Sequence, residues 1–186
     1  MNKKSTKLTS KDLIIARDNI CKTKTRYWRI IKTENIMPTK AIKTNIGSGF
    51  NLKVLYNKIL QMSNTLVKIK LMINAINSGI TTFNYDDAKK THYYNIYVAS
   101  ELKEHLAHWE EILKKSTINP AAKAKAGAKG TGKKETFSSA KITSIKKNLQ
   151  LEINKIDALI AKYNEDTTLS IIDNDDDADV LNTYIA

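Results

Sequence analysis

The stretch that decides the fold is Leu52–Asn77, with the sequence LKVLYNKILQMSNTLVKIKLMINAIN. Apolar residues recur in it every three or four positions, which is the period of one face of an α-helix. These positions are Leu52, Leu55, Ile59, Met62, Leu66, Ile69, Ile73 and Ile76. The pattern predicts a helix over about 52–77 that packs against a partner along its whole length. Gly79 follows, and we expect it to end the helix because glycine adopts the left-handed cap conformation without a steric penalty.

Three other stretches show the same period, and we expect helices over 10–33, 86–115 and 138–168. Their apolar positions are, in order, Leu13, Ile14, Ile20, Cys21, Tyr27, Trp28 and Ile31; Tyr94, Val98, Leu102, Leu106, Trp109 and Leu113; and Ile142, Ile145, Leu149, Ile153, Ile156, Ile160 and Tyr163. Thr9 and Ser10 offer capping oxygens for the first helix. The sequence thus predicts an all-α fold, an elongated antiparallel helical bundle with coiled-coil-like seams and four main helices.

The segments between and around the helices differ in composition. Residues 1–9 are polar and basic, and we expect a flexible start before a helical body over 10–116. The Lys/Ala/Gly-rich segment 117–137 holds no large apolar residue over 120–134, so we expect a linker or arm. Residues 169–186 are expected to form an acidic tail.

The net charge of +12 is divided unevenly along the chain. Residues 165–186 hold seven acids and no Lys or Arg, which leaves 31 basic against 12 acidic residues, or +19, for the remainder. A body of that charge attracts a polyanion or an acidic protein surface, and the tail could itself fold back on it. The candidate polyanion-binding residues are Lys22, Lys24, Arg26, Arg29, Lys32, Lys123, Lys125, Lys129, Lys133 and Lys134.

The apolar stripes exceed what one bundle of this size has to cover, so we expect a homo-oligomer. The candidate oligomer or packing seam consists of Leu55, Ile59, Met62, Leu66, Ile69, Ile73, Ile76, Leu102, Leu106, Trp109, Leu113, Leu149, Ile153, Ile156 and Ile160. Tyr27 and Trp28 could instead stack on nucleic-acid bases, but an aromatic stripe at helical spacing is more typical of a core.

Two motifs resemble ligand sites but lack essential parts. Gly127-x4-Gly132-Lys133-Lys134 departs from a P-loop because Lys134 replaces the magnesium-binding hydroxyl residue and no buried strand precedes it. The acidic run from Asp173 to Asp179 resembles a calcium loop, but lacks that loop's glycine and its bidentate glutamate. We therefore expect no cofactor at either place.

Glu101, His105 and His108 share one helix face at spacings that a metal could use. A closed site needs ligands from a second helix, and the other stripes offer mainly aliphatic residues. We interpret these side chains as a solvated face beside Trp109, and expect no metal and no catalytic residues. An enzyme remains the third alternative, with His105 or His108 as the residues to test.

Cys21 is the only cysteine, which excludes an intrachain disulfide and favours a reducing compartment. We expect it to be a small buried hydrophobe on the first apolar stripe. No stretch approaches the roughly 20 apolar residues of a membrane span, and the start lacks a secretion signal. The expected location is the cytoplasm or the inside of a viral or intracellular particle, without secretion.

Parts of the chain resemble the septicolysin-like family of small helical bacterial proteins. The resemblance covers about residues 55–116 and 150–169. It is carried by Leu55 to Thr81 with Ile73-Asn74 and Gly79-Ile80-Thr81, by Ser100-Glu101-Leu102-Lys103 through Lys114-Lys115-Ser116, and by Glu152 to Asn164 with Thr167-Thr168-Leu169. The resemblance implies an elongated helical fold that self-associates, and it brings no catalytic residues with it.

These features predict a non-enzymatic structural or assembly protein that self-associates, for instance a subunit or virion component of a large intracellular or viral (phage) particle. The alternative is a basic accessory protein that binds nucleic acid or a ribonucleoprotein through its N-terminal helix and Lys-rich arm.

Overall fold

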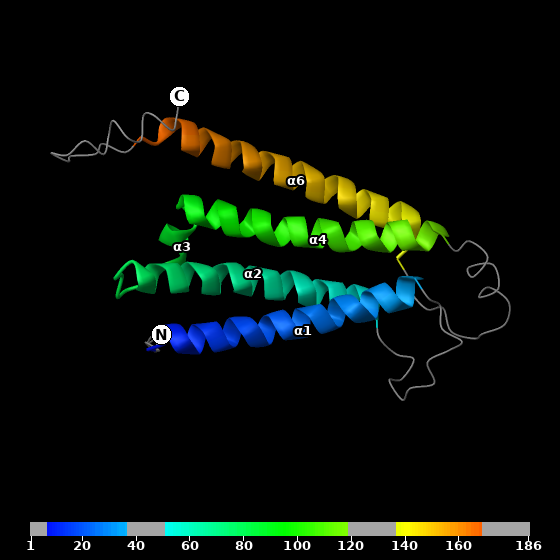
Figure 1. Ribbon diagram of the computed structural model, residues 1–186, viewed down its shortest axis with the longest axis horizontal. Helices are drawn as coiled ribbons and strands as arrows, with labels where there is room; N and C mark the ends of the chain where they lie inside the picture. The colour runs from blue at the N-terminus through cyan, green and yellow to red at the C-terminus, as the bar shows by residue number, and fades with distance from the viewer. Residues whose placement is uncertain (1–6, 37–50, 119–136, 169–186) are drawn as a thin grey trace, which may run out of the picture.

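The computed structural model describes residues 7–36, 51–118 and 137–168, and within these ranges every regular element is a helix (Figure 1). The elements are α1 (Ser10–Ile36), α2 (Leu52–Asn77), α3 (Tyr85–Ala88), α4 (His92–Ile118) and α6 (Ser139–Asp166). The all-α prediction is confirmed. The predicted arm and acidic tail lie almost entirely outside the described residues, as does most of the basic start.

Helix α2 has the bounds that its apolar period predicts. Its first turn is capped by Asn51, whose side-chain oxygen accepts a hydrogen bond from the Val54 amide at 3.1 Å. At the other end Gly79 has a φ of 75°, and the Ile80 amide donates back to the Ala75 carbonyl at 2.9 Å. The predicted role of Gly79 in ending the helix is therefore confirmed.

Helix α1 begins with reciprocal hydrogen bonds between Thr9 and Asp12. The Asp12 amide donates to Thr9 Oγ1 at 3.2 Å, and the Thr9 amide donates to Asp12 Oδ2 at 2.9 Å. This exchange satisfies amides that the first turn leaves without helical partners. The predicted cap at Thr9 is confirmed, and the helix continues to Ile36, three residues beyond the predicted end.

The single helix predicted over 86–115 is wrong, because two helices occupy this stretch. Asn84 caps the short α3 by accepting from the Asp86 amide at 2.9 Å. The Thr91 hydroxyl then donates to the Ala88 carbonyl at 2.7 Å, and its amide donates to the same carbonyl. These local bonds replace the i to i−4 ladder, so the helix stops without a glycine or proline to mark the break.

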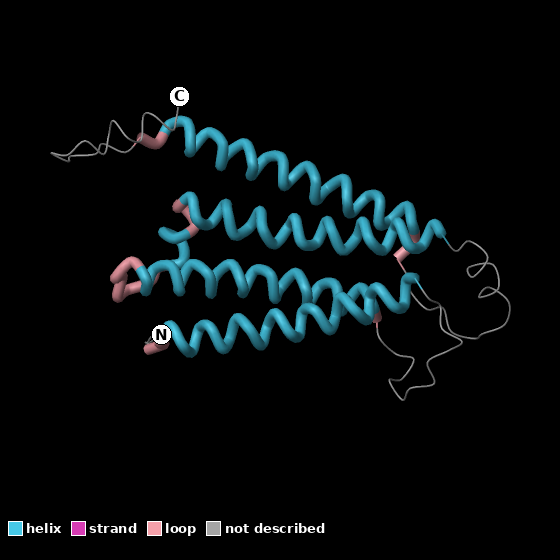
Figure 2. The backbone as a smooth tube through the Cα atoms, in the orientation of Figure 1, coloured by secondary structure: helices cyan, strands magenta, loops and turns pink. Residues whose placement is uncertain are grey.

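The four long helices lie side by side in an elongated molecule, and each runs in the opposite direction to the long helix before it in the chain (Figures 1 and 2). α1 packs on α2, α2 on α4, and α4 on α6, while α1 also contacts α4. α6 lies at one edge and diverges from α4 toward its C-terminal end (Figure 1). α4 therefore occupies the centre, with α1 and α2 on one side and α6 on the other.

The main core forms where α1, α2, α4 and α6 meet. Its buried members are Trp28, Ile31, Leu52, Leu55, Ile59, Trp109, Ile112, Ile142 and Leu149. Trp28 and Trp109 meet edge to face with ring centroids 5.4 Å apart, and Tyr56 packs against both. Two large aromatic rings in van der Waals contact contribute both buried area and a favourable edge-to-face geometry.

The predicted seam residues divide by exposure. Buried are Leu55, Ile59, Leu66, Ile69, Trp109, Leu149 and Ile153; half-buried are Met62, Ile73, Leu102, Leu106, Leu113, Ile156 and Ile160; Ile76 is exposed. The periodic positions thus face other helices almost throughout, as an amphipathic pattern requires.

Candidate functional site

The inner face of α1 carries polar residues as well as apolar ones. Lys24 is only 2% exposed, and its Nζ donates to Glu101 of α4 and, at 2.8 Å, to Glu104 of the same helix. Lys24 is one of the predicted polyanion-binding residues, and this prediction is wrong because its ammonium group is buried against two carboxylates of the same chain. Position 24 lies four residues before Trp28 and therefore on the same side of the helix.

Glu101 is the centre of a charged cluster that joins three helices. Besides Lys24 from α1, Lys70 of α2 donates to its other oxygen, Oε1, at 2.9 Å. Burial raises the pKa of the Glu101 carboxyl, but the hydrogen bonds from the two lysines outweigh it and the pKa is lowered. Together with Glu104, the cluster places two ammonium groups against two carboxylates, so its formal charge is balanced.

Glu104 links this cluster to His108. The His108 Nε2 lies 3.6 Å from Glu104 Oε1, and this contact, together with the bond from Lys24, lowers the pKa of Glu104 to about 2 against the effect of burial. His108 also lies against the indole of Trp28, with ring centroids 4.5 Å apart. The cluster is therefore continuous with the aromatic core.

His105 faces the other side of the cluster and bonds to α2. Its Nε2 lies 2.8 Å from Ser63 Oγ, and both residues are at most 5% exposed. Burial, with the nearby Lys24 ammonium, lowers the pKa of His105 to about 4, so the imidazole is neutral at pH 7. A Ser–His hydrogen bond is also the geometry of an activated nucleophile, but here the hydroxyl lies inside the protein where a substrate cannot reach it.

The interpretation of Glu101, His105 and His108 as a solvated face is wrong, because Glu101 and His105 are buried. The three side chains have different partners, namely two lysines, a serine and the Trp28 ring. Within the described residues, no group of three His, Cys, Asp or Glu side chains is arranged to hold a metal ion. The Lys24 ammonium also lies where a cation would have to bind between Glu101 and Glu104.

The other candidate polyanion-binding residues of α1 have separate environments. Lys22, Arg26 and Arg29 are exposed. Lys32 is half-buried and donates to Glu111 of α4. Lys123, Lys125, Lys129, Lys133 and Lys134 lie outside the described residues.

Two predictions about α1 side chains have opposite outcomes. Cys21 is exposed, so the expectation of a buried cysteine is wrong. Cys21 lies at the edge of the apolar side of α1, and the residue that points inward at this level of the helix is Lys24. Trp28 is a core residue, as its helical spacing favours, and it is too deeply buried to stack on a base.

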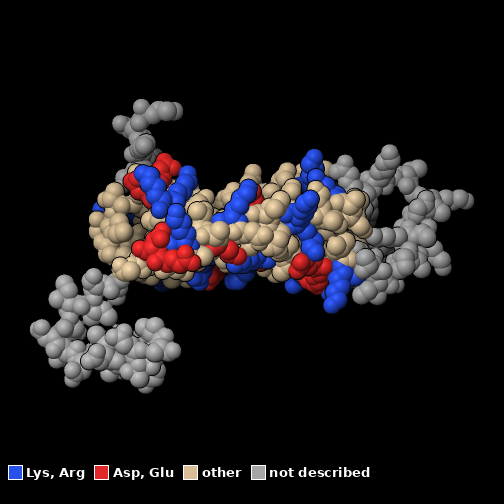
Figure 3. Space-filling model, turned by 90° about the horizontal axis from the view of Figure 1, so that it is seen from above, with Lys and Arg blue, Asp and Glu red and all other residues tan. Residues whose placement is uncertain are grey.

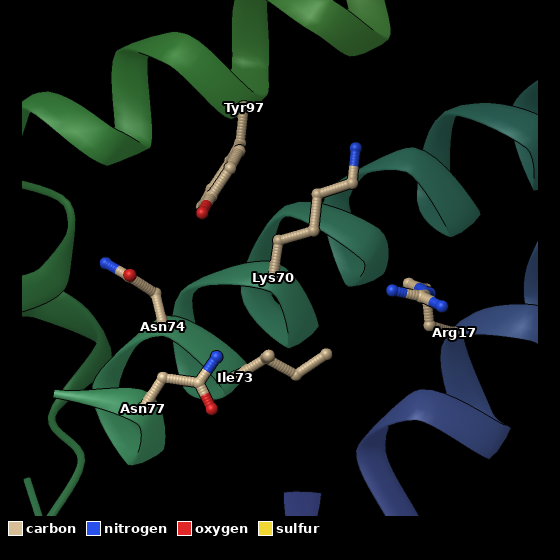
Figure 4. Close-up of a pocket in the computed structure, with 6 residues that line it drawn as sticks. All are labelled: Arg17, Lys70, Ile73, Asn74, Asn77 and Tyr97. Atoms are coloured by element: carbon tan, nitrogen blue, oxygen red, sulfur yellow. The ribbon is translucent and has the colours of Figure 1, made fainter. Parts of the chain in front are cut away.

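A small polar hollow opens beside the charged cluster, between α1, α2 and α4 (Figure 4). Its volume is about 170 Å³, and it is lined by Arg17, Lys70, Ile73, Asn74, Asn77 and Tyr97. Lys70 is common to the hollow and to the cluster. The sequence analysis did not identify Ser63 or Lys70 as site residues, and it did not predict that Lys24 points inward. The spacing of Lys24 four and seven residues before Trp28 and Ile31 could have indicated its orientation.

No family model, curated protein or solved structure matches this chain. No helix in the described part of the chain combines the length and the apolar character that crossing a bilayer requires.

Proposed function

We propose that this chain is a non-enzymatic helical structural protein that self-associates, as a subunit of a large intracellular or viral (phage) particle. The observation that supports it most is the surface of α6, which carries large apolar side chains exposed to solvent. Leu151, Leu159 and Tyr163 are 51%, 54% and 47% exposed. Leu159 and Tyr163 are four residues apart and therefore adjacent on one side of the helix.

The packing of α6 supports this proposal. α6 packs on α4 and has no comparable contact with α1 or α2, so much of its circumference faces solvent. Figure 3 shows the face that α6 forms, where charged groups of both signs are separated by uncharged surface. Each of these side chains is already about half covered, so burying the remainder contributes about half of the roughly 1.5–3 kcal/mol that a whole side chain contributes, and a few of them together stabilise an interface between copies. Association through these residues completes the antiparallel bundle with coiled-coil-like seams that the apolar periods favour.

The charged cluster fits a scaffold better than a reaction centre. Its charges are balanced within α1, α2 and α4, and its carboxylates are held by ammonium groups instead of being poised for proton transfer. A buried ion pair tolerates few relative positions of its two helices, which favours one register over its neighbours. We infer a rigid helical unit, placed in the cytoplasm or inside a particle and related to the septicolysin-like proteins.

The test is the mass in solution, by light scattering coupled to size exclusion at low and high salt over a range of concentrations. We expect a defined multiple of 21.0 kDa that persists at high salt, because apolar contacts are not screened. A mass of 21.0 kDa at every concentration and salt would overturn the proposal.

A second candidate function, binding of nucleic acid or a ribonucleoprotein, is favoured by one specific observation. Lys22, Arg26 and Arg29 are exposed at i, i+4 and i+7, so they form a cationic stripe on the outer side of α1. In this alternative the Lys-rich arm adds further phosphate contacts. Titration of an RNA or DNA oligomer at two salt concentrations tests it, since neutralised phosphates release counterions and the affinity has to fall with salt. An affinity that does not change with salt excludes this alternative.

A further inference from the structure

The polar hollow beside the charged cluster has the chemistry of a carboxylate site. Asn74 and Asn77 present side-chain amides, Tyr97 presents its hydroxyl, and Arg17 presents a guanidinium from the opposite side (Figure 4). Arginine and amide donors in a recess are suited to a carboxylate, which accepts several hydrogen bonds at once.

Arg17 and Lys70, the two cationic residues of the hollow, each already have a carboxylate partner, but these partners do not use all of their hydrogen-bonding capacity. Arg17 Nε donates to Asp18 Oδ1 at 3.0 Å, a bond between adjacent residues of which Arg17 is half-buried and Asp18 is exposed. Such surface pairs contribute little and are readily exchanged. Lys70 donates to Glu101, but Glu101 also binds the buried Lys24. The positive side of the hollow can therefore accept a further carboxylate.

The chain itself contains a segment of matching charge. Residues 169–186 hold five aspartates, namely Asp173, Asp175, Asp176, Asp177 and Asp179, and no Lys or Arg. The rest of the chain has 31 basic and 14 acidic residues, which gives +17. We propose that the segment Asp173–Asp179 binds in the hollow of its own chain, with aspartate carboxylates accepting from Arg17 and the neighbouring amides.

The position of α6 makes this contact reachable. Tyr163 near the end of α6 stacks on His92 at the start of α4, with ring centroids 4.0 Å apart and planes 12° apart. Tyr97 follows His92 by five residues, or about 7.5 Å along the helix axis. The chain from Thr168 to Asp173 can extend about 17 Å, and that to Asp179 about 37 Å, whereas neighbouring helix axes lie about 8–10 Å apart. The described chain therefore ends, at Thr168, at the same end of the molecule as the hollow, and the residues that follow are numerous enough to cross α4.

The native cysteine allows a direct test on the full chain. Cys21 is exposed, is the only cysteine, and lies one turn from Arg17 on the same side of α1. A nitroxide attached to it broadens the amide resonances of residues near the hollow in a ¹⁵N spectrum. We expect the resonances of 173–179 to lose most of their intensity at low salt and to regain it in Arg17→Gln. Arg26→Gln removes an exposed arginine from the same helix and is expected to leave the broadening unchanged.

A label at a second position shows whether residues 173–179 bind specifically in the hollow or are attracted to the basic protein in general. With Cys21→Ser and Ser144→Cys the label sits on α6, 24 residues before Thr168 and so about 36 Å from it, and the tail resonances should stay sharp. Equal broadening from both labels, or the same broadening in Arg17→Gln, would overturn the proposal.

A mixed sample tests whether the segment binds its own chain or a second copy. One chain carries the nitroxide at Cys21 and no ¹⁵N, and the other carries ¹⁵N and Cys21→Ser, so that it has no label. Broadening of the ¹⁵N resonances of 173–179 in this sample would show that the segment binds a second copy, which would overturn the proposal. We expect no broadening in this mixed sample, and the light-scattering mass reports self-association separately.

Discussion

Lys24 of α1 and Glu101 of α4 form a buried ion pair although 77 residues separate them in the sequence. Lys70 of α2 binds the second oxygen of the same carboxylate, so one side chain ties three helices together. Moving a charge out of water is costly, and the pair is stable only because the opposite charges and hydrogen bonds are all in place. The consequences for stability can be measured.

Replacing Lys24 by methionine should destabilise the protein by about 3 kcal/mol, because Glu101 stays buried with only Lys70 to neutralise it. Denaturant unfolding followed by circular dichroism measures the change. Lys22→Met, an exposed neighbour on the same helix, should change stability by less than about 0.5 kcal/mol. The double variant Lys24→Met/Glu101→Leu should recover most of the loss, and its failure to do so would show that the cost lies in packing and not in charge.

Replacing Ser63 by alanine removes the hydrogen-bond partner of His105 Nε2. A buried polar nitrogen without a partner costs about 1–3 kcal/mol, and we expect a loss in this range in the same unfolding assay. Ser144→Ala, at an exposed position of α6, controls for the higher helix propensity of alanine and should be neutral or slightly stabilising. Equal stability of the two variants would contradict a contribution from the Ser63–His105 bond.

Acid should destabilise the protein first through His105. Its folded pKa of about 4 is below the ordinary 6.5, so the unfolded state binds more protons between these values and stability falls as pH falls through this window. The groups that face it are Lys24, Glu104, Glu101 and His108. We expect a loss of about 3 kcal/mol between pH 7 and pH 4.

Unfolding midpoints at pH 7, 5.5 and 4.5 measure this dependence, and His105→Gln should flatten it because glutamine does not titrate. The carboxylates act in a separate window. Glu104, with its pKa of about 2, contributes stability that is lost only below its ordinary pKa of 4.5. A slope that is unchanged in His105→Gln would assign the acid sensitivity above pH 4.5 to another group.

Charge placed on the apolar surface of α6 should weaken self-association. Leu151→Lys/Leu159→Lys removes two half-exposed leucines and should raise the dissociation constant at least about tenfold, since burying the exposed halves of two leucines contributes about as much as burying one whole leucine, about 1.5–3 kcal/mol. The mass from light scattering across a dilution series measures it. Ala158→Lys/Ala161→Lys adds the same charge to the same helix at exposed positions and serves as the control. An equal decrease of the molecular mass in the leucine and the alanine double variants would indicate general charge repulsion and not the loss of an apolar contact.

The sequence alone predicted the four long helices, but not the short α3. Apolar spacing in 52–77 and the glycine that follows predicted α2 with the bounds that it has, because helix period and capping are local properties. The break at Lys89 to Thr91 was missed, since it depends on a threonine hydroxyl that binds a carbonyl and not on a residue that excludes a helix.

Only the tertiary structure decided which polar side chains face inward. Lys24, Glu101 and His105 read as surface residues because charged and ionisable groups are usually solvated. Their burial follows from the packing of α1, α2 and α4, which brings an ammonium group, a carboxylate and a hydroxyl from distant parts of the sequence within bonding distance. A local pattern reports the propensity of one segment, whereas the free energy of a buried charge depends on partners that the fold alone supplies.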